Sequence, residues 1–165
     1  MGTILLTALS GTPLNGRLVY RVSEYSFDFM ASSRAKLNAR AADGERSSLQ
    51  IGTLQIEIVH ATGIALFVWG LHPRVRWNDG HCEPEPAVPG LVRVVAAPPL
   101  VPASALSVAR VGEWDTIYDS KSGWLRSAAA MATLDEQRVL IASGTIIGIR
   151  RERLNSLWLH PEIEH

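Results

Sequence analysis

The stretch TLQIEIVHATGIALFVWGL, residues 53–71, decides the fold class of this chain. Its first eight residues alternate apolar and polar side chains, a period of two that is typical of a half-buried strand. Its last eight residues are apolar on both faces, as expected of a strand covered on both sides. Only Ala61, Thr62 and Gly63 separate the two segments, so we predict an antiparallel hairpin.

Similar patterns predict further strands along the chain. The first ten residues and residues 17–29, 91–96 and 139–150 read as strands, with a hairpin over 110–126 and a return strand over 156–160. Gly144 and Gly148 lie on one face of the 139–150 segment, where they mark a bulge, a bend or a close approach of another element. Six prolines between Arg74 and Pro102 indicate surface loops around the 91–96 strand.

Helical signals are few. Residues 30–42 have a poor apolar stripe and fit a short surface helix and a loop equally well. Residues 127–138 favour a helix more strongly, because three alanines follow Ser127, a residue suited to cap it. We therefore expect one globular domain over residues 1–165, mainly β, with an antiparallel curled sheet or partly open barrel and one or two short helices. A two-layer α+β fold is the alternative.

Composition narrows the classes of partner. The 165 residues contain 16 Lys plus Arg and 16 Asp plus Glu, so no overall charge favours nucleic acid or an anionic membrane. The longest strongly apolar stretch, residues 64–71, is much shorter than the roughly 20 residues that span a bilayer. One cysteine, Cys82, cannot form an intramolecular disulfide, and this favours a cytoplasmic location.

Groups that often carry chemistry have alternative explanations here. Asp79–Glu83 combines metal-ligand residue types, but their spacing is not that of a zinc site and Asn78–Gly80 signals a turn. Asp115 and Asp119 stand four residues apart on a predicted strand, about 13 Å, too far to couple as acid and base. Asp119 is well placed to bond the backbone of its own turn. No nucleophile motif or phosphate-binding loop is present, and we expect no metal and no cofactor.

Two clusters combine arginine with aromatic or turn residues, which suits protein interfaces. The predicted partner-binding residues are Arg74, Arg76 and Trp77 in one cluster and Arg150, Arg151 and Arg153 in the other. The expected function is that of a non-catalytic, soluble intracellular module that binds another protein, for example to neutralise it. One alternative is a small-ligand barrel or a hydrolase using His72, His160, Cys82 or Asp115, which a deep apolar pocket with converging Asp and His would favour. The other is a homo-oligomer formed through an exposed sheet edge.

Overall fold

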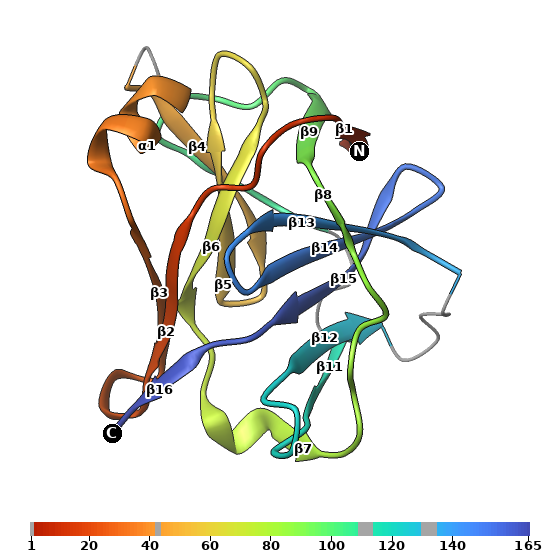
Figure 1. Cartoon of the computed structure of the whole chain (residues 1–165). Coiled ribbons are helices and arrows are strands. Elements are labelled where there is room, and N and C mark those ends of the chain that lie inside the picture. Colours follow the sequence, from red (N-terminus) through yellow and green to blue (C-terminus); the bar gives the residue numbers. More distant parts are fainter. Residues whose placement is uncertain (1, 42–43, 109–113, 130–134) are drawn as a thin grey trace.

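The computed structural model describes residues 2–41, 44–108, 114–129 and 135–165, and 57% of it is strand (Figure 1). One sheet has the spatial order β10 (Ala105–Ser107), β4 (Arg46–Ile51), β5 (Leu54–Val59), β6 (Ala65–Leu71), β3 (Ser26–Ala31), β2 (Gly16–Arg21) and β16 (Glu162–Glu164). The second has the order β7 (Trp77–Asp79), β11 (Trp114–Tyr118), β12 (Leu125–Ala129), β15 (Arg153–Leu159), β14 (Thr145–Arg150), β13 (Gln137–Ala142) and β8 (Val88–Pro89). A third, two-stranded sheet pairs β1 (Thr3–Leu9) with β9 (Leu91–Ala97).

The expectation of a mainly β fold with antiparallel pairing is confirmed, although four strands at sheet edges pair in parallel. None of the three sheets is closed or strongly curled, so the barrel-like part of the expectation is not found. Within the described ranges the only α-helix is α1 (Arg34–Arg40), in which Ser33 Oγ accepts the Lys36 amide at 3.2 Å as an N-cap. One seven-residue helix does not form the helical layer of an α+β fold.

Several predicted elements are confirmed. The decisive hairpin is present, with β5 and β6 antiparallel from the Leu54–Gly70 pair to the Ile58–Ala65 pair. Its turn brings Gly63, at φ 76°, so close to the β9 backbone that an added Cβ would lie 2.4 Å from the Val94 carbonyl oxygen. The described part of the 110–126 hairpin is the β11–β12 pair, and residues 109–113 lie outside the described residues.

Two predicted single strands are each two strands. Residues 17–29 contain most of β2 and most of β3, which reverse through the 3-10 turn η1 (Val22–Glu24) and Tyr25 in the left-handed conformation, φ 54°. Residues 139–150 contain most of β13 and all of β14, which reverse at Gly144, φ 68°. Gly144 is therefore a turn residue and not a bulge or bend within one strand, while the predicted close approach of another element is present, because an added Cβ would lie 2.7 Å from the His160 carbonyl oxygen. The prediction was wrong at both places because the apolar alternation continues across the reversal.

The predicted helix over 127–138 is also wrong in its described part. Ser127 lies in β12, where it pairs with Thr116 on one side and Leu157 on the other. Burial between two neighbouring strands overrides the helix propensity of the alanines that follow. Residues 130–134 lie outside the described residues.

Buried side chains from all three sheets belong to one hydrophobic cluster, including Leu6 of β1, Ile56 of β5 and Leu157 of β15. The chain crosses between the large sheets at its C-terminus, where β15 of one sheet is followed by β16 at the edge of the other (Figure 1). In the described ranges no helix is long and apolar enough to cross a membrane.

Candidate functional site

An exposed, partly apolar surface surrounds the 3-10 turn η2 (Arg74–Arg76), which connects β6 to β7. Val75 is 91% exposed, and Leu71 and Tyr25 are 54% and 56% exposed. The backbone brings Tyr25 beside Leu71, because the amide of the next residue, His72, donates to the Tyr25 carbonyl at 2.7 Å, and Val75 follows three residues later in η2. The "Val75 surface" below consists of Tyr25, Leu71, Arg74, Val75 and Arg76.

Trp77 lies beneath this surface and not on it. Its ring centroid is 4.7 Å from that of Tyr20 and 5.1 Å from that of Tyr118. The Arg74 guanidinium lies 5.7 Å from the Trp77 ring centroid, a distance at which a cation and the face of a ring attract each other. Trp77 therefore helps to fix η2 by packing, while Arg74, Val75 and Arg76 are exposed.

The second predicted cluster occupies the β14–β15 hairpin. Arg151 and Glu152 form its two-residue tip, and Arg150 and Arg153 are the pair that precedes and follows it. The hairpin is tied to β1, since the Glu152 carbonyl accepts the Leu6 amide at 2.9 Å. Figure 1 shows η2 at the bottom and the hairpin turn well apart from it, at the upper right, and β11 and β12 separate β7 from β15. The structure therefore does not bring the two arginine clusters together.

Both tip residues of this hairpin have positive φ, 50° for Arg151 and 61° for Glu152, as a type I′ turn requires. Asn-Gly adopts this turn readily, whereas other side chains pay a backbone strain. We expect replacement of Arg151-Glu152 by Asn-Gly to raise the free energy of unfolding by about 1–2 kcal/mol. Urea unfolding at pH 7 measures this, and an unchanged or lower stability would show that the tip is unstrained. The single change Glu152→Gly should give part of the gain.

A polar cavity of about 290 Å³ lies beside the Val75 surface and includes Val75 and Arg76 in its lining. His72 and Asp115, two of the residues named for the ligand or hydrolase alternative, both line it. His72 Nε2 lies 2.9 Å from Thr116 Oγ1, and this hydroxyl donates to Ser127 Oγ at 3.4 Å. His72, Thr116 and Ser127 are all buried, whereas Asp115 is exposed.

The protonation of His72 follows from this environment. Burial of the imidazole, together with the nearby Arg76 charge, lowers the pKa of His72 from 6.5 to about 4. The ring is therefore neutral at neutral pH and is a weak base. The cavity brings Asp and His to one place, but its lining is rich in polar side chains, so the deep apolar pocket that would favour the ligand interpretation is not found here.

The turn over residues 119–124 is stabilised by contacts with Asp119, Cys82 and His160. The Asp119 carboxylate accepts the backbone amides of Lys121 at 3.0 Å and Cys82 at 3.2 Å, so its expected role in its own turn is confirmed. The Cys82 thiol donates to the Trp124 carbonyl at 3.2 Å, and burial, followed by the Asp119 charge, raises its pKa. His160 stacks on Trp124, and its Nε2 lies 3.1 Å from the Ser122 carbonyl. In the described ranges no three His, Cys, Asp or Glu side chains are grouped to hold a metal ion.

Among the described residues, Glu136 is a tightly held polar group that no sequence motif predicts. Its side chain is fully buried, and Ser156 Oγ donates to it at 2.8 and 2.9 Å and Trp158 Nε1 at 3.0 Å. Arg138 Nε donates to it at 3.0 Å, and Asn155 Nδ2 also donates to it. Burial alone would raise the pKa of Glu136, but the hydrogen bonds from these side chains outweigh it and lower the pKa below 4.5.

Gly148 makes room for this carboxylate. A Cβ at position 148 would lie 2.5 Å from Glu136 Oε2 and 2.1 Å from Ser156 Oγ. Two of the three predicted alternatives for this glycine are present, because another element approaches it closely and the β14–β15 register shifts between Gly148 and Ile149. Because all of the Glu136 side chain is covered, this cluster anchors the start of β13.

Comparison with known proteins adds no family to these observations. No protein-family model matches the chain, and no curated protein matches it either.

Proposed function

We propose that this protein is a non-catalytic binding module that recognises another protein through the Val75 surface. The observation that carries the proposal is Val75 itself, a 91% exposed aliphatic side chain in a turn that also presents two arginines. Arginine is enriched at the energetic centres of protein interfaces, and an exposed apolar side chain beside it adds surface whose removal from water favours binding. The packed rings of Tyr20, Trp77 and Tyr118 beneath the turn reduce the ordering cost of binding.

The charges of the turn indicate the chemistry of the partner. In the part of the chain that the structure describes, no carboxylate lies within the 4.0 Å ion-pair distance of the Arg74 or Arg76 guanidinium. A partner that places acidic side chains around an apolar one would pair with both arginines and cover Val75. We therefore propose an acidic protein partner and no nucleic acid, and a cytoplasmic location consistent with a single buried cysteine.

The hairpin arginines Arg150, Arg151 and Arg153 belong to the proposal as a second, separate contact. Arg151 and Arg153 are exposed, while Arg150 Nε is buried and has no hydrogen-bond partner among the described residues. Only a partner that extends across the molecule would touch both clusters. The effect of Arg151→Ala on capture of a partner tests this contact separately from the first.

The experiment is affinity capture from the native host extract followed by mass spectrometry. The change Val75→Asp should weaken capture of the specific partner by about 30-fold or more, because it places a charge at the centre of the interface. The matched control is Val101→Asp, because Val101 is 60% exposed but lies in the loop before β10, far along the chain from η2. Equal capture by the two variants would remove the Val75 surface from the account.

Small-ligand binding or hydrolysis is a second candidate, favoured by the buried His72, Thr116 and Ser127 in the wall of the cavity. It predicts hydrolysis of a simple ester such as p-nitrophenyl acetate that falls in both His72→Gln and Ser127→Ala. Hydrolysis unaffected by both changes would exclude this chemistry. The third candidate, a homo-oligomer, predicts that purified protein sediments as more than a monomer at high concentration.

A further inference from the structure

The C-terminal strand β16 occupies the edge of the first large sheet. Its three residues pair in parallel with β2, with Glu162 opposite Val19, Ile163 opposite Tyr20 and Glu164 opposite Arg21. Val19 and Tyr20 are completely buried, so the position of β2 is fixed by packing. An edge strand is the place where a sheet accepts an additional strand.

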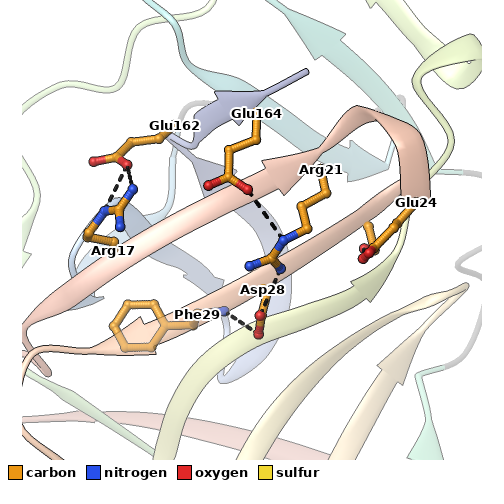
Figure 2. Close-up of polar contacts among 8 residues, drawn as sticks. Arg17, Arg21, Glu24, Asp28, Phe29, Glu162 and Glu164 are labelled. Carbon is orange, nitrogen blue, oxygen red and sulfur yellow. Dashed lines mark hydrogen bonds and ion pairs between the residues drawn. The ribbon is translucent and has the colours of Figure 1, made fainter.

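Charges on the outer face match this register (Figure 2). Arg17 donates to Glu162 Oε2 through Nε at 2.9 Å and through Nη2 at 2.5 Å. Arg21 lies between two carboxylates, with its Nη1 2.8 Å from Asp28 and its Nε 3.4 Å from Glu164. Arg17 and Arg21 at this edge therefore complement an extended segment with acidic side chains at alternate positions.

The contacts that hold β16 are weak. The pairing covers three residues, and the side chains of Arg17 and Glu162 are 54% and 57% exposed, so water screens their ion pair. Ile163 is only partly buried and does not belong to the hydrophobic cluster that joins the sheets. The strand follows Pro161, which cannot donate a backbone hydrogen bond.

Loss of β16 would leave complementary charges behind. Arg21 would keep Asp28, which belongs to β3, but Arg17 would lose the carboxylate with which it pairs. The vacated edge would then present backbone hydrogen-bonding groups beside an unpaired guanidinium. An incoming segment with an acidic side chain that reaches Arg17, as Glu162 does from its place opposite Val19, would restore both.

We propose that the β2 edge is a strand-addition site for an extended acidic segment of a partner protein, and that β16 covers this site until the segment displaces it. The sequence Glu162-Ile163-Glu164 is the internal copy of the ligand pattern: acidic, apolar, acidic. This site is separate from the Val75 surface, and either one can operate without the other.

The test uses the full chain carrying Glu162→Lys and Glu164→Lys, called the released-tail variant below, in which lysines beside Arg17 and Arg21 repel these arginines and release β16. The probe is a fluorescently labelled peptide, His-Pro-Glu-Ile-Glu-His, with the sequence of residues 160–165. By fluorescence anisotropy it should bind the released-tail variant at least about tenfold more tightly than wild type, in which β16 competes from the same chain. Adding Arg17→Glu should abolish this gain.

A peptide with lysine in place of both glutamates is the matched control and should not bind the released-tail variant. Equal affinity of the acidic peptide for wild type, the released-tail variant and the Arg17→Glu variant would overturn the proposal. So would dimerisation of the released-tail variant without peptide binding, because the edge would then belong to a second copy of the chain.

Hydrogen exchange of the wild-type chain provides a measurement that needs no substitution. The amides of Glu162, Ile163 and Glu164 should exchange at least about a hundredfold faster than those of the central strands β5 and β6, because β16 opens locally. Protection of β16 equal to that of β5 and β6 would mean that the strand is not displaceable, and this would overturn the proposal.

Discussion

The change Glu136→Ala should lower the free energy of unfolding by about 3–5 kcal/mol. It removes the carboxylate that accepts hydrogen bonds from Ser156, Trp158 and Arg138. The Arg138 side chain is only 9% exposed, so its charge would remain largely buried without a counter-charge. Urea or guanidinium unfolding at pH 7 measures the loss.

Two comparisons show whether the loss comes from the buried charge. Glu136→Gln keeps the size of the side chain and one of its oxygen acceptors, so it should cost less than Glu136→Ala. Glu85→Ala removes an exposed glutamate and should change the stability by less than about 0.5 kcal/mol. Equal stability of the Glu136→Ala and Glu85→Ala variants would contradict the role of Glu136 as an anchor.

Acidification should destabilise the protein through His72 well above the range in which most carboxylates titrate. The pKa of His72 is about 4 in the folded chain and 6.5 as an ordinary value, so between these values the unfolded chain binds a proton that the folded chain does not. The stabilisation is complete above pH 6.5 and is lost as the pH falls toward 4. Between pH 7 and pH 5 this amounts to about 2 kcal/mol.

The matched variant is His72→Gln, which cannot titrate but can still bond to Thr116. Between pH 7 and pH 5, the free energy of unfolding of this variant should fall by about 2 kcal/mol less than that of wild type. The difference reports His72 alone, because the other histidines and all carboxylates are the same in both proteins. Unfolding curves at the two pH values give this difference directly. Parallel pH dependences would show that the His72 imidazole is solvated in the folded protein.

The strands were more predictable from sequence than the reversals between them. The hairpin over residues 53–71 is predictable because its first strand alternates apolar and polar residues and its second strand is apolar on both faces. This pattern leaves one register that buries the apolar side chains of both strands. The reversal at Tyr25 carries no glycine or proline, so nothing in the local sequence separates β2 from β3. The alanines after Ser127 predict a helix from local propensity. The strand that forms instead depends on pairing with Thr116 and Leu157, two residues that the sequence alone does not bring beside Ser127.

The site residues also differ in how far the local sequence predicts them. Arg74 and Arg76 are predictable as partner-binding residues because they stand beside Trp77 in the sequence, and their exposure follows from a short turn after Pro73. Glu136 was not named, because its donors come from β13 and β15 and meet only in the folded sheet. Gly148, a glycine within a strand-like run, was the one signal of a close approach there.

The most direct test of the account is hydrogen–deuterium exchange of the chain with and without a partner captured from the host extract. The account predicts slower exchange on binding at Tyr25 and over residues 71–76, where Val75 is 91% exposed in the free chain. A bound partner that leaves the exchange of these residues unchanged would contradict it.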